Sequence, residues 1–124
     1  MPFDKYLSED LRVNENLHQV LVVKDSVWPS LWDYSRKALL MRGTASLGVG
    51  RAILRSEKGT RPEWKTRVVR VSYLRIVDLT VVDAKMLGYN DETKTPKQNL
   101  DALISDLCVD GTTRYDFVTV AEIE

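Results

Sequence analysis

The chain has 124 residues with 18 basic and 18 acidic side chains, and 44% of its residues are hydrophobic. This length and composition fit one globular domain with one core. The chain has no run of about 18 apolar residues for a membrane span, and its N-terminal MPFDKYLSED is unlike a signal peptide. Its single cysteine, Cys108, cannot form an internal disulfide, so we expect a cytoplasmic protein with no membrane partner.

The first third of the chain predicts an arm, a strand and a helix. Residues 1–16 are polar and weakly patterned, so we expect an N-terminal arm or short helix on a domain that spans residues 17–124. The β-branched run HQVLVVK predicts a buried strand. SVWPSLWDYSRK predicts a helix of about ten residues with Ser26 as its cap. We expect Trp28 and Trp32 in the core, although one of them can line a cleft.

The middle third predicts strands separated by turns. ALLMRG predicts a strand from 38 to 43, and SLGVGRAILRS predicts another from 46 to 56, with a bend or bulge at its glycines. EKGTRPEWK predicts a hairpin tip. TRVVRVSYLRIVDL predicts a long strand from 66 to 79, in which alternation places Val68 and Arg70 on the same face.

The last third predicts two helices and a strand. TVVDAKMLG and TPKQNLDALISDLCVDG each begin with a capping box, Thr80 with Asp83 and Thr95 with Gln98, and Gly88 ends the first helix. The second helix carries an apolar stripe: Leu100, Leu103, Ile104, Leu107 and Cys108. RYDFVTVAEI predicts a closing strand from 114 to 123. Together the elements predict an α+β fold, a small mixed β-barrel of about five to six strands with two to three short helices.

Charge is unevenly distributed along the chain. Residues 36–75 hold eleven basic and two acidic side chains, a net charge of +9, and the two ends are correspondingly acidic. Such a block indicates a polyanionic partner if the fold gathers it on one face. The alternative is that these side chains are solvated strand edges, neutralised by acids from the ends.

Two segments resemble a known family. VRVSYLRIVDLTVVDAKMLGYND, followed by a second amphipathic helix and a terminal FVTVAEIE, resembles the ASCH domain family of the PUA-like superfamily. SRKALLMR is similar to the upstream marker of that family, G-x-K-x-x-x-x-R, with Ser35 in place of the glycine and with Lys37 and Arg42 at the basic positions. VWPSLW resembles the helix that precedes this marker, so the resemblance covers roughly residues 18–124.

The resemblance implies a β-barrel with a cleft beside its first helix, in a protein that binds RNA or nucleotides. Some members look like ribonucleases. Others are amidohydrolases of modified cytidine, in which the lysine works with a threonine three positions later and a glutamate near the end of the following helix. Here those positions hold Leu40 and Leu87, so the resemblance implies binding more strongly than catalysis.

Lys37 and Arg42 are the first candidate binding residues. In a strand, Leu40 and Arg42 share one face, and Arg42 can reach a phosphate while Lys37 adds a charge at the start of the strand. We therefore hypothesise a basic cleft that holds an anion at this pair. The alternative is that Arg42 pairs with an acid at the core edge, such as Asp78 or Asp83.

Four strand arginines form a second candidate surface: Arg51, Arg55, Arg67 and Arg70. Contacts from them to backbone phosphates would make RNA binding sensitive to salt. Trp64 lies in the neighbouring basic loop. Its ring can stack on a base, or it can fold over the end of the barrel.

The sequence indicates no metal site and no cofactor. His18 has no partner at ligand spacing, and GVG lacks the context of a dinucleotide fingerprint. Three functions remain: an RNA- or nucleotide-binding module, a hydrolase of modified nucleosides or RNA, and a protein-interaction module or inhibitor. The hydrolase would use Lys37 with one of three acids: Asp78, Asp83 or Glu63.

Overall fold

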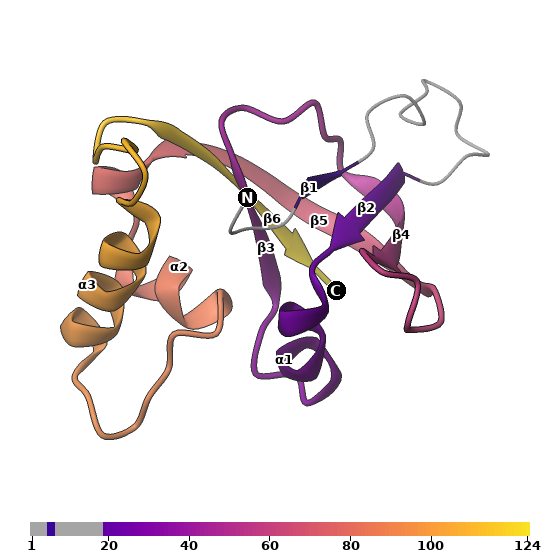
Figure 1. Cartoon of the computed structure of the whole chain (residues 1–124), viewed down its shortest axis with the longest axis horizontal. Helices are drawn as coiled ribbons and strands as arrows, with labels where there is room; N and C mark the ends of the chain where they lie inside the picture. Colours follow the sequence, from indigo (N-terminus) through magenta and orange to yellow (C-terminus); the bar gives the residue numbers. More distant parts are fainter. Residues whose placement is uncertain (1–4, 7–18) are drawn as a thin grey trace.

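The strands of the chain form one mixed sheet (Figure 1). The structure is a computed structural model that describes residues 5–6 and 19–124. Among these described residues, the sheet has six strands in the order β1-β2-β4-β5-β6-β3, with β2 and β4 parallel and all other neighbours antiparallel, and it curls into a half-barrel. The strands are β1 (Lys5–Tyr6), β2 (Gln19–Val23), β3 (Ala38–Arg42), β4 (Gly50–Ser56), β5 (Trp64–Arg75) and β6 (Phe117–Ile123). The predicted α+β fold with a small, mixed, barrel-like sheet is confirmed.

Short helices lie at two places around the sheet. In Figure 1, α1 follows β2 at the bottom of the view, and α2 and α3 lie together on the left. The helices are the 3-10 turn η2 (Asp25–Val27), α1 (Trp28–Trp32), the 3-10 turn η3 (Ile76–Asp78), α2 (Val81–Met86) and α3 (Pro96–Leu107).

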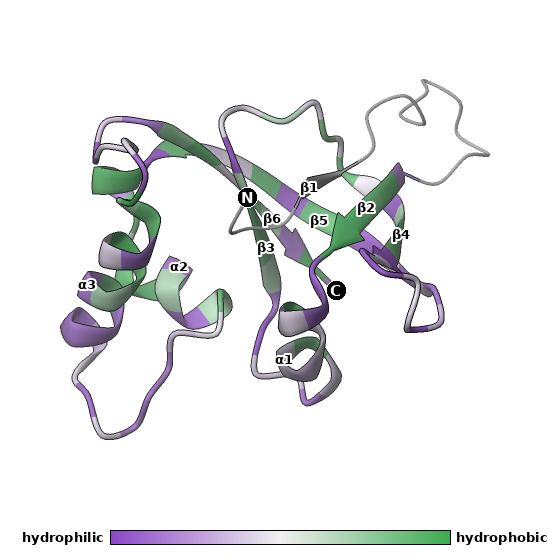
Figure 2. Cartoon of the chain, viewed as in Figure 1, coloured by the Kyte–Doolittle hydropathy of each residue, from purple (hydrophilic) through white to green (hydrophobic). Residues whose placement is uncertain are grey.

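Alternation along the strands builds a core on each face of the sheet. In β3, Leu39 and Met41 lie inside the curl with Trp28 of α1, and we call this cluster the inner core. Leu40 points the other way, toward α2 and α3, into the helix-side core. β6 also alternates between the two cores. Figure 2 shows the result: β2 and β3 are hydrophobic along most of their length, whereas α3 mixes hydrophobic and hydrophilic residues.

Both predicted capping boxes are present. Thr80 Oγ1 accepts a hydrogen bond from the backbone N–H of Asp83, and the Asp83 carboxylate accepts one from the backbone N–H of Thr80. Thr95 and Gln98 form the same reciprocal pair at the start of α3. The predicted apolar stripe of α3 packs into the helix-side core. Local sequence signals therefore predicted the starts of both helices correctly.

The first helix is shorter than predicted. The segment 26–37 contains the end of η2 and then α1, which ends at Trp32. Tyr34 has a positive φ of 61°, a left-handed conformation that does not continue a helix. Ser26 is not the cap: among the described residues, no side chain caps η2 or α1.

The hairpin strands also differ from their predicted bounds. β4 begins at Gly50, four residues later than predicted, because the segment before it is irregular. β5 begins at Trp64 and ends at Arg75, where η3 takes over from the strand. The predicted bend at the glycines is present at Gly50, which has a φ of 139°.

The described part of the N-terminal arm is one short strand. Lys5–Tyr6 pairs with β2, and the rest of the predicted arm or helix, residues 1–16, lies outside the described residues, as does His18. In the part of the chain that the structure describes, no helix is long and apolar enough to cross a membrane.

Candidate nucleic-acid interface

The outer face of the β4–β5 pair carries a row of basic side chains. Arg51 lies directly opposite Arg67, while Lys65 is two residues from Arg67 on the same strand and therefore shares its face. Ala52 and Leu54 point the other way, into the inner core. All the basic residues of this row are exposed, and Arg70 continues the row along β5. We call this row the basic strip: Arg51, Lys65, Arg67 and Arg70.

A β-bulge in β5 places Arg70 on the strip. Val68 pairs with Ile123, and Arg70 pairs with Glu122, the adjacent residue of β6, so Val69 is the extra residue between them. Strict alternation would put Arg70 on the face of Val68, which is fully buried in the inner core. The prediction that Val68 and Arg70 share a face is therefore wrong, because the bulge reverses the alternation between them.

Like charges are concentrated at one end of the strip. Arg51 and Arg67 are direct cross-strand neighbours, and such like-charged pairs destabilise a sheet. At the other end, Arg70 lies opposite Glu122, which offsets part of its charge. The end of the strip formed by Arg51, Lys65 and Arg67 is therefore the part best suited to an anionic partner.

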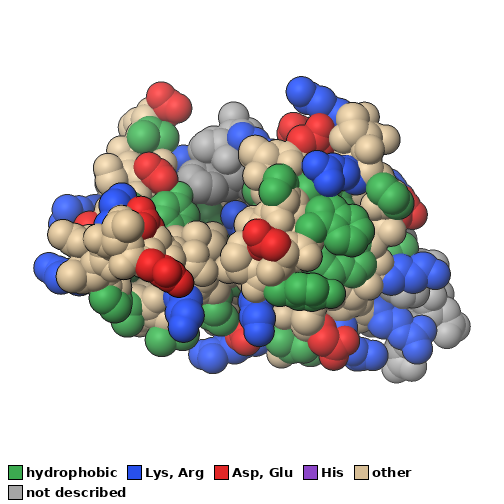
Figure 3. Space-filling model, turned by 90° about the horizontal axis from the view of Figure 1, so that it is seen from below, with side chains coloured by type: hydrophobic (Ala, Val, Ile, Leu, Met, Phe, Trp, Pro, Cys, Tyr) green, Lys and Arg blue, Asp and Glu red, His purple; other side chains and the backbone are tan. Residues whose placement is uncertain are grey.

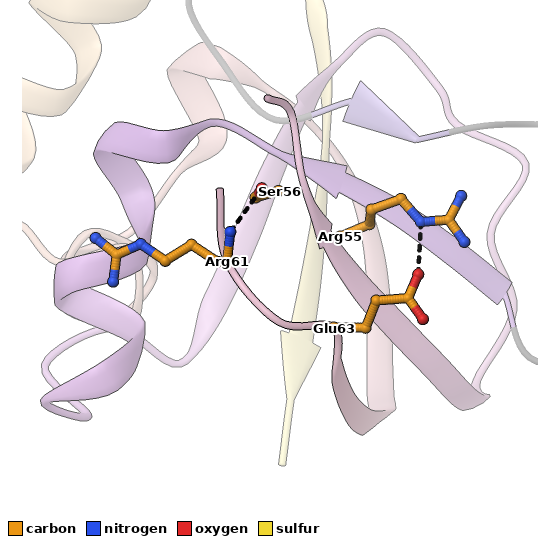
Figure 4. A network of polar contacts seen from close by, with 4 residues as sticks. All are labelled: Arg55, Ser56, Arg61 and Glu63. Carbon is orange, nitrogen blue, oxygen red and sulfur yellow. Dashed lines mark hydrogen bonds and ion pairs between the residues drawn. The ribbon is translucent and has the colours of Figure 1, made fainter. Parts of the chain in front are cut away.

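Arg55 is tied to a neighbouring acid (Figure 4). Its Nε donates a hydrogen bond to the Glu63 carboxylate at 2.7 Å, and the two side chains are 42% and 51% exposed. Figure 4 also shows Arg61 extending to the other side of the hairpin, while its backbone N–H donates to Ser56 Oγ at 3.3 Å. An exposed ion pair such as Arg55–Glu63 contributes about 1 kcal/mol or less to stability. Arg55 shares a face with the strip, but its charge is already paired.

Lys37 and Arg42 are not brought together. They lie at opposite ends of β3, and five steps of extended chain separate them by about 16 Å. Lys37 is exposed, and its backbone joins two elements: its N–H donates to the Met86 carbonyl, and its carbonyl accepts from the Ile123 N–H. Arg42 shares its face of β3 with Ala38, and Lys37, which precedes Ala38, points to the other face. A single small anion therefore does not contact both side chains of the pair that the sequence suggested.

Arg42 joins β3 to the end of α3 through side-chain hydrogen bonds. Its side chain shares a face with Leu40, as strand alternation predicted. Its guanidinium donates hydrogen bonds to Thr112 Oγ1 at 2.6 Å and to the Leu107 carbonyl at 3.3 Å. Leu107 is the last residue of α3, where free carbonyl groups and the helix dipole favour a cation. Arg42 thus has a role in the fold that needs no ligand.

All three tryptophans of the chain meet beside α1. Trp28 is fully buried, and the ring centroids of Trp32 and Trp64 lie 6.4 and 6.3 Å from its centroid. The rings of Trp32 and Trp64 stack, with centroids 5.4 Å apart and planes 5° apart. Figure 3 views the molecule from below Figure 1, the side on which α1 lies. It shows hydrophobic side chains gathered on that side, with lysine and arginine side chains near them.

The environments of the tryptophans decide between the earlier alternatives. Trp64 is half-buried and packs against the inner core, as expected for a ring folded over the end of the barrel. Trp28 lies in the core as predicted. Trp32 is 49% exposed, so the prediction that it packs in the core is wrong: its ring, at the last residue of α1, lies over Trp64.

Lys65 and Trp32 belong to these surfaces, although the sequence did not single them out as binding residues. Lys65 had a readable signal, because it alternates with Arg67 in the same strand. The sequence allowed one of Trp28 and Trp32 to line a cleft, but it did not show which of them, because the exposure of Trp32 depends on a tertiary contact between the hairpin and α1. The hydrogen bond from Thr60 Oγ1 to the Asp25 carboxylate, at 3.3 Å, joins the same two parts of the chain.

Tyr89 links the loop after α2 to α3. Its hydroxyl donates a hydrogen bond to the Asp106 carboxylate at 2.5 Å. Burial raises the pKa of Tyr89 well above its usual range, and the hydrogen bond and negative charge of Asp106 raise it further, while Arg36 opposes the shift. The hydroxyl therefore stays protonated and acts as a structural donor.

Two of the three acids that a hydrolase could pair with Lys37 are engaged elsewhere, whereas Asp78 is exposed at the end of η3. Glu63 pairs with Arg55, and Asp83 belongs to the capping box of α2. Leu40 and Leu87, at the positions that amidohydrolases fill with threonine and glutamate, are buried in the helix-side core. Within residues 5–6 and 19–124, no group of three or more His, Cys, Asp or Glu side chains could hold a metal ion.

Comparison with known proteins identifies no relative, because no family model, curated protein or solved structure matches the chain. The resemblance to ASCH domains therefore stays a prediction from the sequence.

Proposed function

We propose that the protein binds RNA through the basic strip on the outer face of the β4–β5 pair. The observation that carries this proposal is the direct opposition of Arg51 and Arg67 on an exposed sheet face, with Lys65 and Arg70 beside them. Phosphate contacts of this kind supply most of the affinity of proteins that bind nucleic acids without reading their sequence.

The dimensions of the strip favour a chain of phosphates over a single anion. Lys65 and Arg67 lie two residues apart on an extended strand, so their Cα atoms are about 7 Å apart, and Arg51 lies one strand away from Arg67. Long, flexible side chains at this spacing can each reach a different phosphate of one strand. Every contact then adds to affinity separately and releases counterions.

The charge pattern of the chain supports the same proposal. The sequence keeps a net charge of zero, yet it places Arg51 and Arg67 side by side, where they repel each other in the free protein. A polyanion bound across the pair would remove this repulsion. The bound state would therefore be stabilised by more than the direct contacts alone.

Lys37 lies apart from the strip. Ala38 lies opposite Glu122 of β6, and Glu122 lies opposite Arg70 of β5, so Ala38 shares the face of the strip. Lys37 precedes Ala38 and therefore points to the other face of the sheet. The resemblance of SRKALLMR to the ASCH marker supports a contribution of Lys37 to RNA binding, whereas the bonds of Arg42 to α3 and its following loop give that residue another role.

The test is RNA binding by a strip variant and a charge-matched control. The strip variant carries Arg51→Ala together with Arg67→Ala, and the control carries Lys97→Ala together with Arg114→Ala, which are also exposed. Binding is measured by fluorescence anisotropy with a short, labelled, single-stranded RNA at low salt. We expect the strip variant to bind at least roughly tenfold more weakly and the control to bind like the wild type.

Equal affinity of the strip variant and the wild type would place the RNA elsewhere and would overturn the proposal. A wild-type protein that binds no RNA at low salt would also overturn it. The protein-interaction module would then be the next function to test, because it needs no polyanion.

A further inference from the structure

We propose that the stacked Trp32–Trp64 pair is a stacking site for an unpaired nucleobase, so that the RNA bound by this protein is single-stranded. This inference rests on the proposed RNA binding, because it names the form of RNA that the protein takes. The basic strip can hold phosphates of any nucleic acid, whereas an aromatic platform needs a base that is free of its partner strand.

The geometry of the pair provides the platform. The planes of Trp32 and Trp64 differ by 5°, so the two rings are nearly parallel and form one stack. Trp32 is 49% exposed, and Trp64 is the half-buried member that anchors the stack to the inner core. Trp28 is fully buried, and its centroid lies 6.4 Å from that of Trp32 and 6.3 Å from that of Trp64, so it packs beside both rings of the stack. A planar ligand can extend this stack on the exposed side of Trp32 without moving a core residue.

The charges around the platform favour a base attached to phosphate over other aromatic-binding ligands. The hairpin tip that leads into Trp64 carries the exposed cations Lys58 and Arg61. A quaternary ammonium would be repelled there, and it needs a cage of rings set around it instead of two rings stacked face to face. A neutral sugar would gain nothing from the cations. A nucleotide uses both features, its base on the ring and its phosphate on a cation.

The platform and the strip lie on the same hairpin but on opposite faces of β5. Trp64 begins β5 with its side chain toward the inner core, and the next residue, Lys65, points outward as the first member of the strip. A single strand that runs along the strip and turns over the start of β5 would reach the platform. A stiff double helix could not follow this turn, and its bases would be stacked on one another already.

Intrinsic fluorescence gives a direct readout, because every tryptophan of the chain belongs to this cluster. The ligands are a single-stranded oligouridine and an abasic oligonucleotide of the same length and charge. We expect oligouridine to quench the tryptophan emission with a saturable dependence on concentration. The abasic strand should bind the strip, as anisotropy would report, and leave the emission almost unchanged.

Variants separate the platform from the strip. Trp32→Ala removes the exposed ring and should weaken oligouridine binding by roughly 5- to 150-fold, the range of one base stacked on one aromatic ring, without changing the affinity for the abasic strand. Trp32→Phe keeps a smaller ring and should keep part of the affinity. Tyr115→Ala removes another exposed aromatic residue, outside the cluster, and should change neither affinity. Circular dichroism and thermal unfolding check that each variant is folded.

The outcomes distinguish this inference from the proposed function. If oligouridine and the abasic strand bind equally well and Trp32→Ala changes neither, the protein binds RNA by its strip alone and the platform inference is overturned. If the wild type binds neither strand, the proposed function and the inference that rests on it both fall. If Trp32→Ala instead alters the oligomeric state of the free protein, the rings form a contact between copies of the chain, and the inference is again overturned.

Discussion

At the scale of single residues, the fold decides which basic side chains are available for a ligand. Arg42 and Arg67 are both arginines of the basic block, yet Arg42 is half-buried with its guanidinium bonded to Thr112 and Leu107, and Arg67 is exposed beside Arg51. The sequence predicted correctly that Arg42 shares a face with Leu40. It could not show that α3 ends against that same face, because the contact joins residues that are 65 positions apart.

Replacing Arg42 should affect stability and not RNA binding. Arg42→Ala removes two hydrogen bonds from a charged donor and leaves the end of α3 without its cation, so we expect a loss of about 2 kcal/mol in the free energy of unfolding. Lys37→Ala, at an exposed position, should change stability by less than about 0.5 kcal/mol. Urea denaturation measures both values. An Arg42→Ala protein of wild-type stability that has lost RNA affinity would show that Arg42 is a ligand contact.

Tyr89 makes the stability of the protein depend on alkaline pH. Its pKa is raised in the folded state, so above about pH 10 the unfolded chain loses a proton that the folded chain keeps. The unfolded state then binds fewer protons, and stability falls as the pH rises from about 10 toward the higher folded pKa. Tyr89→Phe should lack this part of the decline, whereas Tyr115→Phe, at an exposed tyrosine, should keep it. Identical pH dependence of the wild type and Tyr89→Phe in urea denaturation would contradict the role of Tyr89.

At the scale of elements, the sequence predicted what local chemistry determines. The capping boxes at Thr80 and Thr95 and the apolar stripe of α3 involve residues within a few positions of each other, and all are present. The end of α1 and the bulge in β5 were missed. The bulge depends on a partner distant in sequence, because Val69 becomes an extra residue only through the register between β5 and β6. The end of α1 comes with the positive φ of Tyr34, a conformation that the spacing of apolar residues does not show.

The capping box of α3 should contribute measurably to stability. Thr95→Ala removes the hydroxyl that accepts a hydrogen bond from the Gln98 backbone N–H, and we expect it to cost about 1 kcal/mol. Thr95→Ser keeps a hydroxyl at the same position and should cost much less. The midpoint of urea denaturation gives both values. Equal losses in the two variants would mean that the methyl group of Thr95, and not its hydroxyl, supports the start of α3.

At the scale of the whole molecule, the half-barrel places the basic residues of segment 36–75 in different environments. One face of the sheet encloses the inner core with α1. The other face packs on α2 and α3 at β3 and β6, and it is exposed at β4 and β5, where it carries the strip. Composition and charge order predicted a polyanionic partner, and three of the four strip residues were among the predicted binding residues: Arg51, Arg67 and Arg70. Lys37 and Arg42 belong to one short sequence motif, and we predicted from this that they bind one anion together. The extended strand between them instead separates their Cα atoms by about 16 Å.

The salt dependence of RNA binding tests the role of the strip most directly. A protein that places four cations on the phosphates of a single strand should lose affinity with a slope of about 3 in log affinity against log salt concentration, since each contact contributes about 0.7. Arg51→Ala together with Arg67→Ala should lower that slope by about 1.4, and the charge-matched Lys97→Ala with Arg114→Ala should leave it unchanged. A strip variant with the same slope as the wild type would contradict the account, because the RNA phosphates would then lie on other residues.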